Sequence, residues 1–277
     1  MSPDEYCQQK AAASGSSFYY SFLFLPAERR RAITALYAFC REVDDVVDEC
    51  ADPQLAATKL AWWRSELANL FADHPQHPVT KALLPFTEKY SFSRENLGEI
   101  IDGMEMDLTQ ARYLDWAGLE LYCYRVAGVV GLLAAGIFGY RDARTLEYAR
   151  SLGIAFQLTN IIRDVGEDAR KNRIYLPMAD LRQFGVPAAD ILQARETPQF
   201  ARLMAFEAAR AREHYERALQ ALPPADRKAQ RPGLVMAAIY RTLLDEIERD
   251  GFRVLTRRTS LTPLRKFWIA WRTWVIA

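Results

Sequence analysis

Apolar residues recur every three or four positions along most of this 277-residue chain, and this spacing predicts amphipathic α-helices. The strict alternation of apolar and polar residues that is typical of half-buried strands is absent. Helices are predicted over Arg29–Glu49, Leu55–Phe71, Arg94–Thr109, Leu119–Phe138, Ala143–Asp164, Phe200–Leu222 and Pro232–Val254. The connections are short and no linker or repeat interrupts them, so the sequence predicts one all-α domain over residues 1–277.

Composition excludes several classes of function. The 36 Lys and Arg residues nearly balance the 35 Asp and Glu residues, which argues against a nucleic-acid-binding protein. Four scattered cysteines form no CxxC pair and only three histidines occur, so neither a disulfide scaffold nor a zinc site is expected. The longest uncharged stretch, Val126 to Tyr140, is shorter than a membrane span, and the N-terminal residues lack a signal-peptide pattern. We therefore expect a cytoplasmic protein with a buried apolar core helix.

A first cluster of candidate functional residues lies late in the predicted helix over Arg29–Glu49. At 100° per residue, four side chains share one face of that helix, namely Tyr37, Arg41, Asp44 and Asp48. The two carboxylates repel each other, and burial beside neighbouring valines raises that cost. A cation that neutralises them would explain the arrangement, and the alternative is a solvated acidic face.

A second polar face occurs about 120 residues later, on a helix that is otherwise strongly apolar. It consists of Gln157, Asn160, Asp164 and Asp168. Buried amides and carboxylates need partners, so this face indicates either a functional site or a buried structural network.

The two faces together predict a magnesium site. Each offers two aspartates four positions apart, and if the helices face each other, the carboxylates would form a cage of oxygen ligands, with water and substrate phosphate at the remaining positions. Cations that suit an arriving phosphate lie nearby, namely Arg41, Arg163, Lys171 and Arg173. A di-iron site would require Glu-x-x-His pairs, which the chain lacks.

Small residues recur at every fourth position of another predicted helix, at Ala127, Gly131, Ala135 and Gly139. They indicate either close helix packing or the wall of a pocket for a long apolar ligand. Aromatic residues that belong to the core, or that line such a pocket and stabilise a carbocation, are Phe18, Tyr19, Tyr20, Phe22, Phe24, Phe138 and Phe156.

From about Ser14 to about Leu255, the chain resembles the squalene/phytoene synthase family. The motifs that carry the resemblance are Ser14–Phe18, Ala35–Arg41 with Asp44–Asp48, Gly103–Leu108, Tyr122–Gly128, Gln157–Asp168, Arg173–Pro177 and Ile239–Arg241. Members of this family are head-to-head prenyl transferases. The resemblance implies the single-domain isoprenoid synthase helical fold around a central apolar cavity, with Mg²⁺ as cofactor.

The resemblance also implies roles for individual residues. Magnesium ions that bridge the substrate diphosphates would be held by Asp44, Asp48, Asn160, Asp164 and Asp168. Asp107 and Tyr122 would line the reaction centre. Substrate contacts would come from Ser14, Ser16, Ser17, Phe18, Tyr37, Arg41, Gln157, Asn160, Arg163, Lys171, Arg173 and Tyr240. Several relatives have His and Lys where this chain has Ser14 and Ser16, so only hydroxyl and backbone contacts are expected there.

Within the family, the segments Ser16–Phe22 and Cys40–Glu49 most resemble presqualene diphosphate synthases of bacterial squalene and hopanoid biosynthesis. Such an enzyme joins two farnesyl diphosphates into a cyclopropyl diphosphate. The alternatives within the family are phytoene or dehydrosqualene synthase and squalene synthase. The non-enzyme alternatives are a prenyl-lipid binding protein and a helical scaffold, and no obligate protein partner is expected.

The C-terminal segment Leu261–Ala277 contains three of the six tryptophans, Trp268, Trp271 and Trp274, together with basic residues. It is too short to span a bilayer but has the composition of interfacial segments. We expect either an ordinary terminal helix or weak peripheral contact with the inner face of the membrane.

Overall fold

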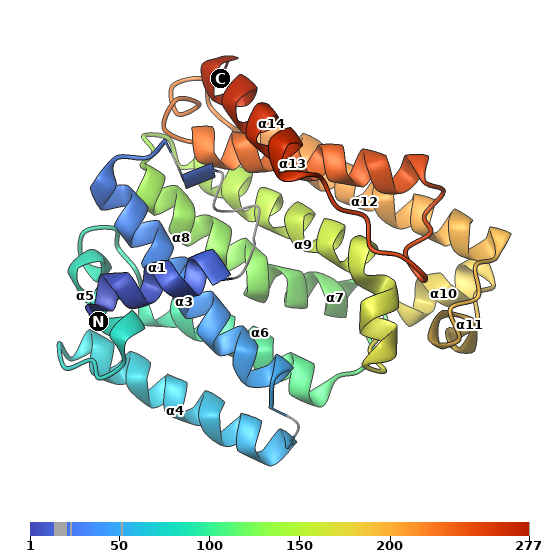
Figure 1. Ribbon diagram of the computed structural model, residues 1–277, viewed down its shortest axis with the longest axis horizontal. Coiled ribbons are helices and arrows are strands. Elements are labelled where there is room, and N and C mark those ends of the chain that lie inside the picture. Colours follow the sequence, from blue (N-terminus) through green and yellow to red (C-terminus); the bar gives the residue numbers. More distant parts are fainter. Residues whose placement is uncertain (14–20, 23, 51, 277) are drawn as a thin grey trace.

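The computed structural model describes residues 1–13, 21–22, 24–50 and 52–276, and these residues are predominantly helical (Figure 1). The helices are α1 (Pro3–Ala13), α3 (Ala27–Asp48), α4 (Pro53–Phe71), α5 (Pro78–Thr87), α6 (Arg94–Thr109), α7 (Trp116–Cys123), η1 (Tyr124–Gly128, a π-helical turn), α8 (Val129–Phe138), α9 (Arg144–Arg170), α10 (Met178–Phe184), α11 (Ala188–Leu192), α12 (Pro198–Ala221), α13 (Arg231–Arg249) and α14 (Pro263–Ile276). The described residues contain no strand, only an isolated bridge between Arg112 and Ile174. The predicted all-α fold is confirmed.

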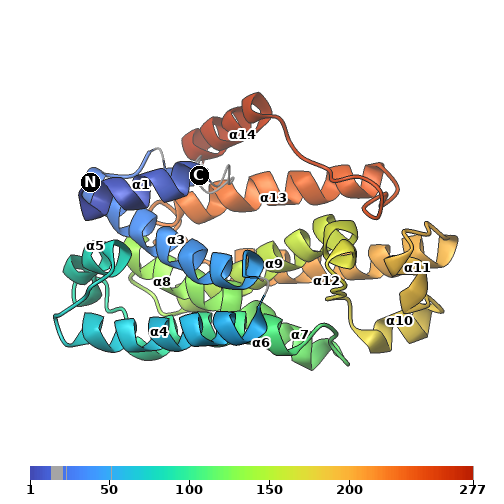
Figure 2. The same ribbon diagram turned by 60° about the horizontal axis from the view of Figure 1, so that its bottom comes forward.

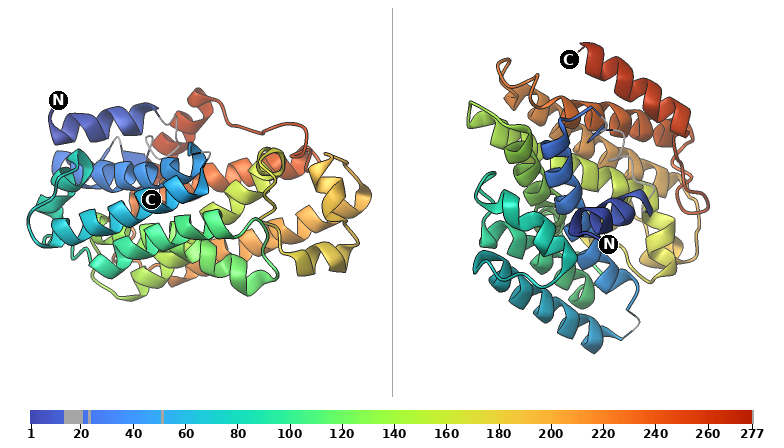
Figure 3. Two further views of the ribbon diagram at one scale, coloured as in Figure 1. Left: turned by 90° about the horizontal axis from the view of Figure 1, so that it is seen from below. Right: turned by 60° about the vertical axis from the view of Figure 1, so that its left-hand side comes forward.

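Helix α9 lies in the middle of the bundle and packs against α8, α12 and α13. Helices α3, α4 and α6 lie on one side of it, and α12 and α13 lie on the other (Figures 1 and 2). Figure 3 shows α1 and α14 as outer helices. The two helices predicted to carry aspartate pairs, α3 and α9, are therefore both close to the centre of the molecule.

Side-chain caps explain where several predicted helices begin. Ser93, Asp115 and Thr197 each accept a hydrogen bond from a backbone amide three residues later, which satisfies an amide that has no partner within the helix. These caps start α6, α7 and α12.

The sequence pattern missed α1, α5, α10 and α11, and it placed some helix ends wrongly. The proline-rich segment before α5 indicated a break, but Pro78 occupies the first position of that helix, where its missing N–H costs nothing. Helix α9 continues past Asp164 to Arg170, so Asp168 lies on the same helix as Asp164.

The apolar core consists of two clusters with a cavity of about 170 Å³ between them. One cluster is built mainly on α9, α12 and α13, and the other mainly on α3 to α6. The cavity is lined by residues of both clusters, on α3, α8, α9 and the start of α13. This is the expected central apolar cavity.

The continuous helical segment Trp116–Phe138 is long and apolar enough to cross a membrane by length and composition. It is longer than the uncharged stretch from which the sequence predicted a core helix. Helices α6 and α9 pack against it, and Val126, Val130 and Phe138 line the cavity. These contacts are those of a central helix of the bundle.

Candidate active site

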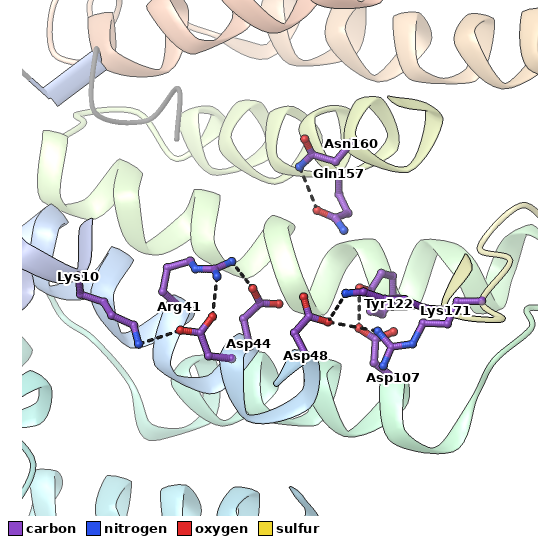
Figure 4. A network of polar contacts seen from close by, with 11 residues as sticks. Lys10, Arg41, Asp44, Asp48, Asp107, Tyr122, Gln157, Asn160 and Lys171 are labelled. Carbon is purple, nitrogen blue, oxygen red and sulfur yellow. Dashed lines mark hydrogen bonds and ion pairs between the residues drawn. The ribbon is translucent and has the colours of Figure 1, made fainter. Parts of the chain in front are cut away.

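The cavity has a polar end, which is formed where α3 and α9 carry their aspartates. Tyr37 and Cys40 of α3 and Gln157 and Asn160 of α9 line the cavity near this end. One helical turn further along each helix come Asp44 and Asp164, and Asp48 and Asp168 follow another turn on. We call these four aspartates the mouth of the cavity. Figure 4 shows the α3 pair with Gln157 and Asn160 facing it.

On α3, cations partly neutralise the carboxylates of the mouth. Arg41 pairs with Asp44 and with Asp45, and Lys10 lies 2.7 Å from Asp45. Burial nevertheless raises the pKa of Asp44 to about 6, against the opposing effect of Arg41. Such a carboxylate gains from a further cation nearby.

Asp48, at the outer edge of the mouth, faces two cations from the segment after α9. Its Oδ1 lies 3.3 Å from the Lys171 ammonium and 3.4 Å from the Arg173 guanidinium (Figure 4). These two predicted diphosphate contacts therefore lie at the mouth, and each can move from Asp48 to an arriving phosphate.

On α9, two guanidinium groups hold Asp164. Burial disfavours its ionisation, but Arg163 and Arg258 outweigh burial and keep the pKa of Asp164 below its usual range. Asp168 has no guanidinium bonded to it among the described residues, and burial together with the charge of Asp164 raises its pKa to about 7, against the opposing effect of Lys171 and Arg173. Two neighbouring carboxylates whose pKa values are shifted in opposite directions are typical of a site that binds a charged ligand.

A glycine brings Arg258 to the mouth. The Gly166 amide donates to the Val254 carbonyl at 3.2 Å, and a Cβ at this position would lie 2.4 Å from the Leu255 oxygen. Only glycine permits such a close approach. The segment after α13 can therefore lie against α9, where the Arg258 Nε donates to Asp164 at 2.8 Å.

Asp107 of α6 lies beside Asp48 at the outer edge of the mouth (Figure 4) and is held by two tyrosines. The hydroxyls of Tyr122 and Tyr175 each donate to its carboxylate at 2.9 Å. Burial raises the pKa of Asp107 to about 6 despite these bonds. Tyr175 reaches it because the segments after α6 and α9 pair at the bridge between Arg112 and Ile174.

The residues of the mouth fit a divalent cation that substrate phosphate helps to bind. The described residues include no group of three acidic, His or Cys side chains arranged to hold a metal, so the predicted cage is not formed by protein alone. The buried Asn160 Oδ1 has no hydrogen-bond partner among the described residues, and the mouth supplies oxygen donors, which Mg²⁺ prefers. Because the two aspartate pairs lie on separate helices, a diphosphate between them would complete the coordination.

The remaining predicted site residues are placed as follows. Tyr37, Gln157 and Asn160 line the cavity, and Tyr240 packs against Phe156 with ring centroids 4.9 Å apart. Arg163 pairs with Asp164 rather than standing free. Four predicted substrate contacts, Ser14, Ser16, Ser17 and Phe18, lie outside the described residues.

The stripe of small residues serves both predicted purposes. A Cβ at Gly131 would lie 2.3 Å from the Ala149 oxygen, so this glycine permits close packing of α8 on α9. Ala127, Gly131 and Ala135 also line the cavity. Of the predicted aromatic lining, Phe22, Phe138 and Phe156 line the cavity, whereas Phe24 packs against Trp274, and Tyr19 and Tyr20 lie outside the described residues.

Sequence reasoning missed two residues of this site. Tyr175 lies inside the motif Arg173–Pro177 that carries the family resemblance, so a signal existed, but no role was assigned to it. Arg258 follows α13 in an irregular segment without any motif, so only the fold reveals that it pairs with Asp164.

Aspartate pairs and cations at the mouth, with an apolar cavity beneath, define a helical enzyme that binds a diphosphate ester of a long hydrocarbon chain. The chain belongs to the squalene/phytoene synthase family, because the model of that family matches residues 11–265.

Relatives with known names agree with this assignment. The chain is 37% identical to 15-cis-phytoene synthase of Synechocystis sp., over 96% of this chain and 84% of that protein. It is 36% identical to phytoene synthase of Arthrospira platensis, over 95% and 89%.

Solved structures show the same fold. A dehydrosqualene synthase in complex with a ligand superimposes with a TM-score of 0.90 at 28% identity, over 99% of this chain and 96% of that one. Squalene synthase HpnC from Alicyclobacillus acidocaldarius superimposes with a TM-score of 0.81 at 30% identity, over 90% and 94%.

Proposed function

We propose that this protein joins two prenyl diphosphates head to head with release of diphosphate. The observation that carries the proposal is the pair of aspartate motifs, on α3 and α9, at the polar end of a cavity whose interior is apolar. A scaffold or a lipid carrier would not need four carboxylates and several guanidinium groups beside the polar end of such a cavity.

The polar end and the apolar walls of this cavity have separate roles in the condensation. Ionisation of the allylic C–O bond transfers negative charge to the departing diphosphate, and Arg173 and Lys171 at the mouth stabilise that charge. Bound magnesium would be held by the mouth aspartates and Asn160 and would supply further Lewis-acid stabilisation. The apolar walls exclude water, which would otherwise capture the carbocation, while the alkene of the second substrate attacks it.

The proton lost at the end of the condensation needs an acceptor. Burial raises the pKa of Tyr122 far above its usual value, and this neutral phenol already donates to Asp107. We therefore assign Tyr122 the role of positioning Asp107. The released diphosphate or the Asp107 carboxylate is the better base.

The length of the prenyl chain separates two candidate products. The curated relatives named phytoene synthase favour phytoene, a C40 hydrocarbon built from two C20 units, over the presqualene diphosphate that the sequence resemblance suggested. The solved structures named dehydrosqualene synthase and squalene synthase favour two C15 farnesyl units.

Product identification tests the proposal. The full chain would be incubated with Mg²⁺ and with farnesyl or geranylgeranyl diphosphate, with and without NADPH, and the products identified by mass spectrometry. A C40 triene from geranylgeranyl diphosphate would show a phytoene synthase, and presqualene diphosphate from farnesyl diphosphate would support the sequence-based prediction. Squalene formed only with NADPH would show a squalene synthase. No condensation of either substrate would contradict the proposal.

We further propose that α14 holds the protein at an anionic membrane, on the cytoplasmic side, where a water-insoluble product can leave into lipid. Helix α14 packs on α13 through Ala270, but its outer face is apolar. The exposed fractions there are 84% for Leu264, 57% for Trp268, 45% for Trp271 and 62% for Val275. Trp274 is instead partly buried against Phe24, so two of the three tryptophans, not all three, share this face.

The positive charges beside this face favour an anionic lipid surface as its binding partner. At 100° per residue, Arg265 and Arg272 both lie along one edge of the apolar face of α14. Arg265 pairs with Glu246 at 2.7 Å, and an aromatic surface with arginines along its edge suits the headgroup region of an anionic bilayer. The four free cysteines, Cys7, Cys40, Cys50 and Cys123, fit the reducing side of such a membrane.

Vesicle sedimentation tests the membrane contact. The full chain should sediment with vesicles that contain phosphatidylglycerol, and the double variant Trp268→Ser/Trp271→Ser should sediment several-fold less. Trp62→Ser is the matched control, because Trp62 is 47% exposed on α4. Equal sedimentation of the double variant and the wild type would overturn the proposal, as would a dimer that the double variant abolishes without any vesicle binding.

A further inference from the structure

The lining of the cavity runs from the polar end beside the mouth to a far end. On α9 its lining runs from Asn160 back to Tyr148, and on α8 it ends at Phe138. On α3 the lining residue furthest from the mouth is Ile33. The far end therefore lies where α8 joins α9 and where α13 begins.

Tyr148 closes this end by reaching from α9 to α13. Its side chain is 1% exposed, and a Cβ at Gly233 would lie 2.4 Å from its hydroxyl oxygen. The phenol hydroxyl thus fits against α13 because position 233 carries no side chain. The hydroxyl has no hydrogen-bond partner among the described residues. Burying an unpaired hydroxyl does not stabilise the fold, so a tyrosine here indicates another role.

The position of Tyr148 sets a length. Asn160 is the lining residue of α9 nearest the mouth, so we measure the space for the hydrocarbon chain from there. It lies twelve residues further along α9 than Tyr148, which corresponds to about 18 Å along the helix axis. Van der Waals contact with the ring takes about 3.5 Å of this distance, which leaves about 14 Å. Carbon–carbon bonds of about 1.5 Å advance an extended chain by about 1.25 Å each, so a farnesyl chain is about 14 Å long and a geranylgeranyl chain about 19 Å.

We propose that Tyr148 is the floor of the prenyl pocket and restricts the substrate to farnesyl diphosphate, because one further isoprene unit would collide with its ring. The inference rests on the proposed function, since the diphosphate must be held at the mouth for the distance to apply. It assigns a specificity-determining residue that lies far from the reacting atoms.

The test compares two substrates on one enzyme preparation. We expect the wild type to prefer farnesyl over geranylgeranyl diphosphate in kcat/KM, and the ratio of geranylgeranyl to farnesyl activity to rise at least tenfold in Tyr148→Ala. Tyr148→Phe keeps the ring and should keep the wild-type ratio. Because the ratio is measured within each preparation, partial loss of folded protein cancels, and Tyr148→Leu provides a variant that leaves a smaller void.

A binding measurement separates failure of this inference from failure of the proposed function. The unreactive analogues farnesyl thiolodiphosphate and geranylgeranyl thiolodiphosphate would be titrated against each variant with Mg²⁺ present. A shift in relative affinity toward the longer chain in Tyr148→Ala and Tyr148→Leu would support the floor even if no condensation occurred. A wild-type preference for the longer chain, or a ratio unchanged in both variants, would overturn it.

Discussion

The two ends of the cavity are built on opposite principles. At the mouth, Asp44 and Asp164 are ionisable groups held by guanidinium partners from α3, α9 and the segment after α13. At the far end, most lining residues are apolar, the Gln230 amide donates to the carbonyls of Ala135 and Gly139, and the Tyr148 hydroxyl has no polar partner among the described residues. Charge at the mouth can respond to a departing diphosphate, whereas a packed ring can only exclude atoms. Substitutions at the mouth should therefore change the rate of reaction, and substitutions at the far end should change which substrate reacts.

The largest effect is expected from removing one carboxylate of the mouth. Asp44→Asn and Asp164→Asn should each lower kcat by roughly 10³-fold, about 4 kcal/mol of transition-state stabilisation, because each loses an oxygen ligand beside the diphosphate. Steady-state kinetics with Asp73→Asn, an exposed aspartate between α4 and α5, as the control would measure this. Near wild-type turnover in both variants would show that the mouth does not bind the metal.

The same two variants should differ in stability. Removing Asp44, whose pKa burial raises, should stabilise the metal-free protein at neutral pH. Removing Asp164 leaves the mostly buried Arg163 without its carboxylate and leaves Arg258 only its longer contact with Glu167, at 3.3 Å, so that variant should lose stability. From the sequence alone, repulsion within each pair suggests that both would gain, and thermal melting in EDTA distinguishes the two expectations.

A smaller effect is expected at the far end from Gly233→Ala. The added methyl group would lie 2.4 Å from the Tyr148 hydroxyl oxygen but 3.4 Å from the ring carbon that carries it. The variant should lose about 1–3 kcal/mol of stability through overpacking, and Tyr148→Phe should relieve most of that loss. A double-mutant cycle by urea denaturation measures the coupling. Additive losses would mean that the two groups do not press on each other.

The sequence predicted the mouth better than the far end, for a physical reason. Asp44, Asp48, Asp164 and Asp168 repeat at the period of a helix, and a polar stripe on an apolar helix is visible without any tertiary structure. Tyr148 is one aromatic residue among many apolar neighbours. Its function depends on Gly233, which is distant in sequence and comes into contact only through the packing of α9 and α13.

The helices that were missed show the same limit. Long helices that bury one face have a strong period, and α3, α9 and α13 were all predicted. Helices α10 and α11 have seven and five residues, too few for a period to show. The pairing of the segments around Arg112 and Ile174, which brings Tyr175 to Asp107, is irregular backbone without a pattern of its own.

A smaller effect again is expected from Tyr175→Phe, beside the mouth. It removes one of the two hydroxyls that donate to Asp107, so the pKa of Asp107 should rise further above about 6. We expect kcat to fall about tenfold, or about 1.4 kcal/mol, with KM nearly unchanged and the acidic limb of the pH–rate profile moved to higher pH. Tyr113→Phe is the matched control, since the Tyr113 hydroxyl has no partner among the described residues. Equal profiles for the two variants would remove Asp107 from the reaction.

The smallest effect is expected from Glu207→Gln, which tests whether a raised pKa by itself indicates a site. Glu207 of α12 is 1% exposed, and its Oε2 accepts from Arg210 at 2.6 Å. Burial raises the pKa of Glu207 to about 7, as high as that of Asp168, yet Glu207 does not line the cavity.

Between the unfolded pKa of 4.5 and the folded pKa of about 7, Glu207 holds a proton in the folded state that it has lost in the unfolded state. The contribution of Glu207 to stability is therefore present below pH 4.5 and is lost as the pH rises to about 7. Glutamine resembles the protonated acid, so the variant should gain on the order of 1 kcal/mol over the wild type between pH 5 and pH 8, as measured by urea denaturation, while turnover stays unchanged. A loss of turnover in Glu207→Gln would mean that the chemistry of this enzyme extends beyond the mouth and the far end of its cavity.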